Sequence, residues 1–148
     1  MFHYESIESY HQELLEGKTS CSHAVEYYLS NISRNKHLNA FTAIFAVEAL
    51  QKAAELDAKR MTGEPLKKLH GVVIAIKDVI CYKDHVVTAS SAILKGFVSL
   101  YNATAVQCLL DEDAIIIGSC NCDEFAMGST NENSVYGPAV NAIGDNMV

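Results

Sequence analysis

The sequence predicts an α/β protein in which N-terminal helices precede a parallel or mixed sheet. Two observations support this fold class. Apolar residues recur at helical spacing in the first third of the chain, whereas residues 71–76 and 114–118 form short apolar runs rich in β-branched side chains. A helical pattern at 103–111 lies between these runs, and helices that alternate with buried strands are typical of an α/β sheet.

The first third predicts two helices. Ser6 is a candidate N-cap, and Gly17 is placed to end the helix that follows it. Thr19 or Ser20 can cap the second helix. An apolar stripe along that second helix predicts a packing face rather than a cofactor site. The stripe consists of Cys21, Val25, Tyr28, Leu29 and Ile32.

A short strand at 40–45 and a third helix at 47–61 complete the N-terminal part. The helix is rich in Ala, Leu, Glu and Lys, which favour helical backbone. Residues 62–65 contain glycine and proline and form a linker. We therefore divide the chain into an N-terminal helical segment, 1–65, and the start of a core, 66–148.

The core segment predicts strands at 71–76, 86–88 and 114–118. From Met127 onward the sequence is rich in glycine, serine and asparagine and predicts loops. A domain that stops in a polar loop is expected to be incomplete.

Composition limits the possible functions. The 148 residues are 49% apolar and 20% charged, which suits one globular domain. The net charge of −7 argues against a nucleic-acid surface on this segment, although another subunit could hold a nucleic acid. No apolar run approaches the ~20 residues of a membrane span, and the start shows no signal-peptide pattern. A cytoplasmic protein without a membrane partner is expected.

The five cysteines are an odd number without paired spacing, which favours free thiols in a reducing compartment. Cys120 and Cys122 would share one face of an extended segment. A zinc site needs about four ligands, and no histidine or second cysteine pair lies nearby in the sequence. We therefore expect no metal site.

Lys77 ends the apolar run at 71–76 and is followed at once by Asp78. A lysine at the end of a buried strand costs free energy unless it is paired or uncharged. One interpretation is a surface ion pair between Lys77 and Asp78. The other is a catalytic base that burial keeps partly uncharged. The strand pattern alone leaves both open.

Three segments together resemble the amidase signature family, and within it the A subunits of the amidotransferases for Glu-tRNA(Gln) and Asp-tRNA(Asn). The first is Leu-His-Gly-Val-Val-Ile-Ala-Ile-Lys-Asp at 69–78, and the second is Ala-Ile-Ile-Ile-Gly at 114–118. The third, Asn-Cys-Asp-Glu-Phe-Ala-Met-Gly-Ser at 121–129, runs on to Asn133, Ser134 and the Gly-Pro pair at 137–138. The likeness covers essentially the whole chain, and Asp-Glu-Phe-Ala-Met-Gly-Ser is its most specific part.

The resemblance implies a Ser-Ser-Lys catalytic unit on a mixed-sheet fold. Lys77 matches the family's base, which takes a proton through a bridging serine from a nucleophilic serine. Both serines of the family lie in or after a Gly-Gly-Ser-Ser-Gly-Gly-Ser stretch that would follow Val148, so neither is assigned in this chain. The chain is thus expected to be the N-terminal part of a truncated enzyme, inactive alone. The resemblance implies that Met127, Gly128 and Ser129 form the pocket wall; the alternative is a loop that only packs on the sheet.

The resemblance also implies partners. The full enzyme would be a carbon–nitrogen ligase of protein biosynthesis that hydrolyses glutamine and passes ammonia to a partner subunit. Amidotransferase B and C subunits would be the partners, and misacylated tRNA would be bound through the complex. No cofactor is expected on this chain, while the partner subunit would use ATP and Mg. Two alternatives remain: part of a stand-alone amidase for another small amide, or a non-catalytic truncated remnant that survives as an interaction module or fails to fold.

Other charged residues are expected to be structural. Asp123 and Glu124 stand at a predicted helix start, where capping or a salt bridge is favoured over acid–base work. Asp78 is expected to orient the loop of Lys77. His70 shows no ligand spacing and is expected to be a surface or packing residue.

Overall fold

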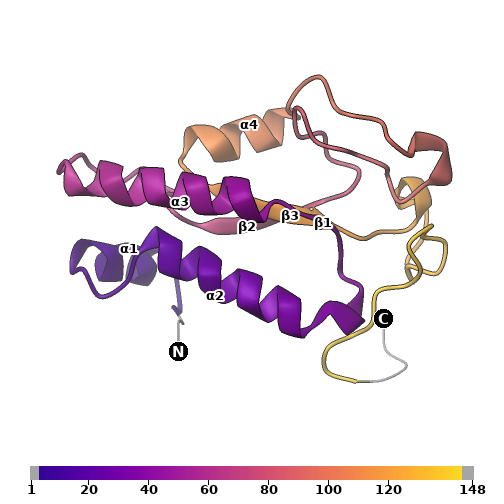
Figure 1. The fold of residues 1–148 in the computed structure, drawn as a ribbon, viewed down its shortest axis with the longest axis horizontal. Coiled ribbons are helices and arrows are strands. Elements are labelled where there is room, and N and C mark those ends of the chain that lie inside the picture. Colours follow the sequence, from indigo (N-terminus) through magenta and orange to yellow (C-terminus); the bar gives the residue numbers. More distant parts are fainter. Residues whose placement is uncertain (1–3, 145–148) are drawn as a thin grey trace. The chain divides into compact units, whose positions relative to one another are not determined.

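A computed structural model of the protein describes residues 4–144 and confirms the predicted α/β class. Figure 1 shows the elements in chain order. They are α1 (Ile7–Leu15), α2 (Cys21–Arg34), the 3-10 turn η1 (Lys36–Leu38), β1 (Phe41–Ile44), α3 (Ala46–Met61), β2 (Val73–Lys77), η2 (Ala92–Leu94), α4 (Thr104–Asp111), β3 (Ile115–Cys120) and η3 (Glu124–Ala126). Within residues 4–144, no helix combines the length and the apolar character needed to cross a bilayer.

The sheet is mixed, as the resemblance to the amidase signature family implies. Its strand order is β1-β3-β2, and β1 runs antiparallel to β3, with Ala43 opposite Ser119. The Val72 carbonyl accepts a hydrogen bond from Ile115 N–H at 2.9 Å, and Asp78 N–H donates to the Cys120 carbonyl at 3.0 Å. The residue numbers of both partners rise together, which defines β2 and β3 as parallel.

The chain divides into two compact units, and neither is a continuous stretch. Unit 1 contains the residues up to 34, then 45–74 and 108–117, and unit 2 contains 35–44, 75–107 and the residues from 118 on. The strands β2 and β3 each begin in unit 1 and end in unit 2. The division of the chain into segments 1–65 and 66–148 stays a prediction.

The helix ends in unit 1 follow the predicted capping. Ser6 Oγ accepts from Ser9 N–H at 3.1 Å, and Ser9 Oγ accepts from Ser6 N–H at 3.0 Å, which completes a capping box on α1. Gly17 follows the helix with a φ of +70°, a backbone conformation that suits glycine. Ser20 Oγ accepts from His23 N–H at 3.0 Å, so Ser20 is the cap of α2.

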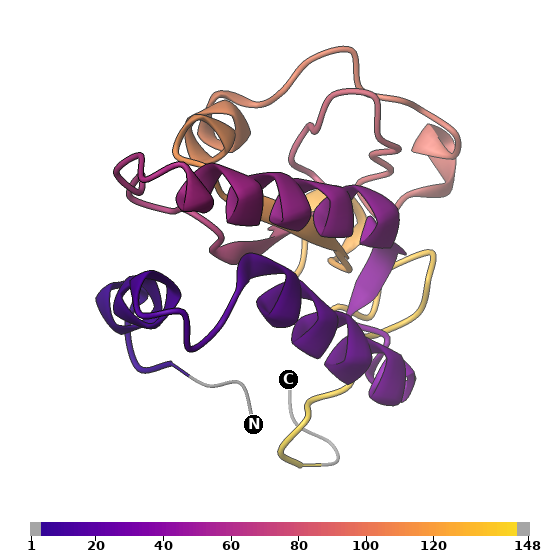
Figure 2. The ribbon, with the colours of Figure 1, turned by 60° about the vertical axis from the view of Figure 1, so that its left-hand side comes forward.

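A second cap on α2 comes from α3, which lies beside it (Figures 1 and 2). The Asp57 carboxylate accepts from Cys21 N–H at 2.8 Å and from Ser22 N–H at 3.0 Å. Burial raises the pKa of Asp57, but these hydrogen bonds outweigh it and hold the pKa below its usual value. The negative carboxylate thus also interacts favourably with the positive, N-terminal end of the α2 dipole.

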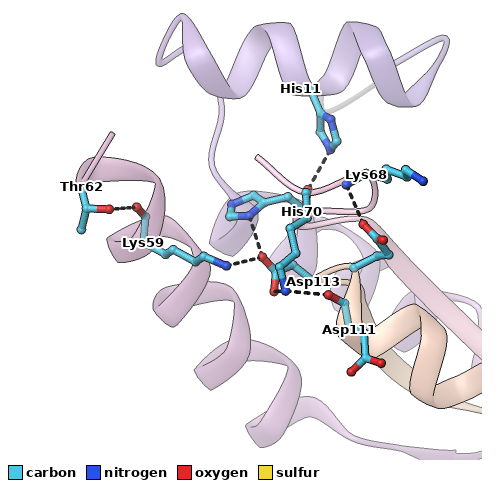
Figure 3. Close-up of polar contacts among 9 residues, drawn as sticks. His11, Lys59, Thr62, Lys68, His70, Asp111 and Asp113 are labelled. Atoms are coloured by element: carbon cyan, nitrogen blue, oxygen red, sulfur yellow. Dashed lines mark hydrogen bonds and ion pairs between the residues drawn. The ribbon is translucent and has the colours of Figure 1, made fainter. Parts of the chain in front are cut away.

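Asp113, just after α4, is the centre of a charged cluster in unit 1 (Figure 3). Its carboxylate lies 2.7 Å from Lys59 Nζ and 3.6 Å from Lys67 Nζ. Burial raises the pKa of Asp113, but the hydrogen bond and charge of Lys59, the charge of Lys67 and the contact with His70 together outweigh burial and leave that pKa below its usual value. His70 Nδ1 lies 3.5 Å from the same carboxylate, too far for a well-formed hydrogen bond.

His70 is a packing residue, one of the two roles that the sequence allows. Its side chain is buried, and neither ring nitrogen has a hydrogen-bond partner among the described residues. The backbone carbonyl of His70 contacts His11 Nε2 at 3.1 Å. Burial lowers the pKa of the His70 imidazole, with Asp113 opposing that effect.

The strand predicted at residues 86–88 is wrong. Val86 forms only an isolated bridge with Val98, within a long loop. Beyond Val86 the chain turns, because Thr88 N–H and Oγ1 both donate to the Asp78 carboxylate. Ala89 and Ser90 then adopt φ values of +50° and +51°, which a strand cannot contain.

Gly71→Ala is expected to destabilise the protein by roughly 2–4 kcal/mol. Gly71 has a φ of +74°, and a Cβ there would lie 2.4 Å from Cys21 Sγ. Gly63→Ala is the matched control, since Gly63 has a φ of +81° but nothing within 4 Å of the added Cβ. Urea unfolding should therefore give a clearly larger loss for Gly71→Ala, and equal losses would contradict the steric explanation.

The stability of the protein should fall as the pH drops below about 6.5, the unfolded-state pKa of histidine. Since burial lowers the pKa of His70 in the folded state, the unfolded state binds that proton more readily in this window. Above pH 6.5, neutral His70 makes its full contribution to the free energy of unfolding. This contribution is lost as the pH falls through the lowered folded-state pKa of His70. His70→Gln should flatten the slope of unfolding free energy against pH, whereas His37→Gln, at an exposed position, should not. Identical slopes in wild type and His70→Gln would contradict this assignment.

Candidate functional site

Unit 2 contains a hollow of about 360 Å³ at the end of β2 and beyond β3. Such a volume suits a small-molecule ligand. Its lining comes from the last residue of β2, from the segment after β3 and from the loop that continues to residue 141. The lining residues are Lys77, Asn121, Cys122, Asp123, Gly128, Ser129, 130–131 and 139–141.

The parallel pairing of β2 and β3 explains why these residues meet. The carboxyl ends of parallel strands lie at the same edge of a sheet, where ligands of α/β proteins commonly bind. The bond from Asp78 N–H to the Cys120 carbonyl aligns the two ends. Lys77 and Asn121, which lie next to these bonded residues in the sequence, therefore both line the hollow.

Lys77 is exposed at the hollow. Among the residues that the structure describes, its side chain makes no salt bridge or hydrogen bond, so the surface pair with Asp78 is not formed. A base needs an uncharged amine, which burial favours. The described residues place Lys77 at the hollow but do not themselves desolvate it.

Asp78 is buried and is not among the residues that line the hollow. Its carboxylate accepts hydrogen bonds from Thr88, from Ser90 N–H at 3.0 Å and from Ser119 Oγ at 3.3 Å. These contacts hold the loop after β2 against the end of β3. The structural role that the sequence predicts for Asp78 is thus seen in the hydrogen bonds.

Asp123 holds the loop at residues 128–133, which we call the rim of the hollow. Its carboxylate accepts from Asn131 N–H at 2.9 Å and from Asn133 N–H at 3.4 Å. Gly128 passes so close that a Cβ there would lie 2.4 Å from Asp123 Cγ. The residue at 128 therefore has to be small because of a contact within the protein.

The neighbouring side chains of Asp123 and Glu124 make different contacts. Asp123 precedes η3, yet its side chain does not cap that turn and bonds to the rim loop instead. Glu124 accepts a hydrogen bond from Ser91 Oγ at 2.6 Å. Both side chains thus hold loops together, whereas the capping of η3 and the salt bridge expected from the sequence are not formed among the described residues.

The predicted pocket wall is only partly assembled at the hollow. Gly128 and Ser129 line it with Lys77, while Met127 is 80% exposed and is not among the lining residues. The roles of Lys77 as base and of Met127, Gly128 and Ser129 as pocket wall stay predictions.

Asn121 is a site residue whose role sequence reasoning missed. Its Nδ2 donates to the Asn39 carbonyl at 3.1 Å and to the Gly137 carbonyl at 2.9 Å. Its Oδ1 accepts from Ser134 Oγ at 2.6 Å and from Ser90 Oγ at 3.3 Å. One amide therefore ties several loop segments together, and its place directly after a buried strand was the available signal.

The cysteines near the hollow are free thiols. Cys122 is buried and lines the hollow, and its N–H donates to Ser90 Oγ at 3.2 Å. Burial raises the pKa of the Cys120 thiol. In the part of the chain that the structure describes, no cluster of three His, Cys, Asp or Glu side chains could hold a metal ion.

The fold and the hollow define a mixed α/β protein with a lysine at the carboxyl end of a parallel strand. The family model for amidases matches residues 23–148, and the chain therefore belongs to the amidase family. Two relatives are the A subunits of glutamyl-tRNA(Gln) amidotransferase from Chlorobium phaeobacteroides (strain BS1), 43% identical over 99% of this chain, and from Salinibacter ruber, 43% identical over 93%. The chain spans 31% and 27% of their lengths, respectively.

Solved structures, amidases among them, share the fold. A chain of a vestigial protein complex related to the origins of an s-triazine catabolic enzyme superposes with a TM-score of 0.86 at 32% identity. It is matched over 90% of this chain and 30% of its own length. A bacterial aryl acylamidase of the amidase signature family gives a TM-score of 0.85 at 26% identity, over 94% of this chain and 29% of its own. The predicted first part of an amidase signature fold is thereby confirmed.

Gly128→Ala is expected to cost about 1–3 kcal/mol of stability, because the added methyl group overlaps the Asp123 carboxylate. In an Asp123→Ala background the overlap disappears, so the same change at 128 should cost much less. Thermal unfolding of the four proteins of this double-mutant cycle measures the coupling. Additive effects of the two substitutions would mean that Gly128 is not constrained by Asp123.

Proposed function

We propose that this chain is part of the A subunit of a tRNA-dependent amidotransferase and contributes the catalytic lysine of its glutaminase site. The observation that carries the proposal is the placement of Lys77 at the hollow together with Gly128 and Ser129. Identity of 43% to A subunits of glutamyl-tRNA(Gln) amidotransferase supports this choice of activity.

The proposed chemistry is acyl transfer. Uncharged Lys77 accepts a proton, through a bridging serine, from a nucleophilic serine whose oxygen attacks the amide carbonyl of glutamine. The tetrahedral intermediate collapses with departure of ammonia, which takes up the transferred proton. Water then hydrolyses the acyl-serine to glutamate. No serine of this chain is assigned to either position, so we propose that both come from outside residues 1–148 and that the 148-residue chain alone does not hydrolyse glutamine.

Residues of unit 2 would set the geometry of this reaction. Effective proton transfer needs a base within hydrogen-bond reach of the proton that it accepts. The hydrogen bond from Asp78 N–H to the Cys120 carbonyl fixes the backbone beside Lys77, and thus the point from which the Lys77 side chain extends. The contacts of Asp123 with Asn131 and Asn133 hold the loop that carries Ser129, a residue that lines the hollow.

The partners follow from this proposal. Ammonia would pass to the B subunit, which amidates misacylated tRNA with ATP and Mg, while the C subunit completes the complex. This chain itself would bind neither cofactor, and the complex would work in the cytoplasm as a ligase of translation. The surface of this chain, with a net charge of −7, is compatible with tRNA held by another subunit.

A second candidate is a stand-alone amidase for another small amide. The solved structures that resemble the chain include the aryl acylamidase and the peptide amidase of Stenotrophomonas maltophilia, the latter with a TM-score of 0.80 at 26% identity over 90% of this chain and 29% of its own. The same lysine chemistry would serve that activity. Hydrolysis of aryl or peptide amides in preference to glutamine would select this candidate.

Lys77→Ala is expected to reduce glutaminase turnover at least about a thousandfold in the complete enzyme, since removal of a member of such a catalytic unit costs several orders of magnitude. Lys77→Arg should fail as well, because arginine stays protonated at any working pH. Lys83→Ala, an exposed lysine in the following loop, is the matched control and should retain normal turnover. Glutamate release measures the rates, and near-normal turnover of Lys77→Ala would overturn the assignment.

A further inference from the structure

Asp78 is a buried carboxylate directly beside the proposed base. Its side chain is 1% exposed, and each carboxylate oxygen accepts hydrogen bonds. Oδ1 accepts from Thr88 N–H at 3.2 Å and from Ser119 Oγ at 3.3 Å, and Oδ2 accepts from Thr88 Oγ1 and from Ser90 N–H at 3.0 Å. Within residues 4–144, no lysine, arginine or histidine forms an ion pair with it. These hydrogen bonds therefore offset the cost of burying the carboxylate.

The turn that surrounds Asp78 is held in a costly conformation. Ala89 and Ser90 adopt φ values of +50° and +51°, which residues with a Cβ rarely adopt. Such a backbone persists only where its surroundings hold it. Ala89 N–H donates to the Asp78 carbonyl at 2.9 Å, while the amides on either side, those of Thr88 and Ser90, donate to its carboxylate. Asp78 thus provides the hydrogen-bond acceptors for three consecutive backbone N–H groups of the turn, those of residues 88–90.

The same turn contacts Asn121 and Cys122, the part of the lining that directly follows β3 and that we call the Asn121–Cys122 wall. Ser90 is fully buried, and its Oγ accepts from Cys122 N–H at 3.2 Å and donates to Asn121 Oδ1 at 3.3 Å. Asn121 and Cys122 line the hollow together with Lys77. A continuous set of hydrogen bonds therefore leads from Asp78 through Ser90 to the wall.

We propose that Asp78 is a positioning residue that fixes, through Ser90, where Lys77 lies relative to the Asn121–Cys122 wall. Asp78 does not line the hollow and takes no part in proton transfer. Its importance for catalysis rests on the proposed role of Lys77 as base, whereas the coupling from Asp78 to the wall exists independently of any activity.

The coupling is tested by amide hydrogen exchange on this chain. In Asp78→Asn, exchange at Cys122 N–H should rise about tenfold or more, as expected when a buried acceptor is lost, although Cys122 N–H donates to Ser90 and not to Asp78. The N–H of Asn131, which donates to Asp123 in the same unit, should keep its rate. The NMR signal of the Lys77 ε-methylene should shift in the same variant. Asp84→Asn, an exposed aspartate of the same loop, should change none of these signals.

A second variant covers the case in which Asp78→Asn fails to fold. Thr88→Val keeps the shape of the side chain and the backbone donor but removes the hydroxyl that donates to Asp78. It should raise exchange at Cys122 in the same direction by a smaller factor. Unchanged exchange at Cys122 in the folded variants, or an equal rise at Asn131, would overturn the positioning role.

The complete enzyme separates this inference from the proposed function. If it hydrolyses glutamine, Asp78→Asn should lower kcat about tenfold to a hundredfold with KM nearly unchanged, because a misplaced base affects the chemical step. A rise in KM with unchanged kcat would contradict positioning of the base. If the wild-type enzyme shows no glutaminase activity, the proposed function fails, while hydrogen exchange still decides the role of Asp78.

Discussion

The parallel alignment of β2 with β3 is the constraint on which the candidate site depends. The bond from Asp78 N–H to the Cys120 carbonyl brings the ends of both strands to the same edge of the sheet. This alignment brings Lys77 and the segment that starts at Asn121 to the same hollow, although they lie far apart in the sequence. A slip of one residue in this pairing would turn Lys77 to the opposite face.

Beyond the strand ends, buried and half-buried polar groups organise unit 2. Asp78, Asp123 and Asn121 each collect hydrogen bonds from loops that have no regular structure of their own. A buried polar group without partners costs free energy, so a conformation that satisfies all three is strongly preferred over nearby alternatives. Long loops can in this way hold a defined shape without the ladder of bonds that a sheet supplies.

Sequence reasoning succeeded where the deciding interactions are local. Ser6, Gly17 and Ser20 act on helix ends close to them in the chain, and their roles were predictable from residue type. It failed where the partner is distant: nothing in the pattern of residues 86–88 reveals that Thr88 turns to meet Asp78. The fold class and the position of Lys77 could be predicted, whereas the bonds that shape the hollow could not.

The exposure of Lys77 sets a physical condition on the proposed chemistry. A lysine acts as a base only when it is uncharged, and contact with water favours the charged form. Asn121 of the wall and Ser129 of the rim line the hollow with Lys77 but leave it in contact with water. A glutaminase site at this place therefore requires further atoms that cover the hollow and carry the nucleophile. Since this chain spans 31% of the length of the Chlorobium phaeobacteroides relative, such a relative has enough additional chain to supply a cover of this kind.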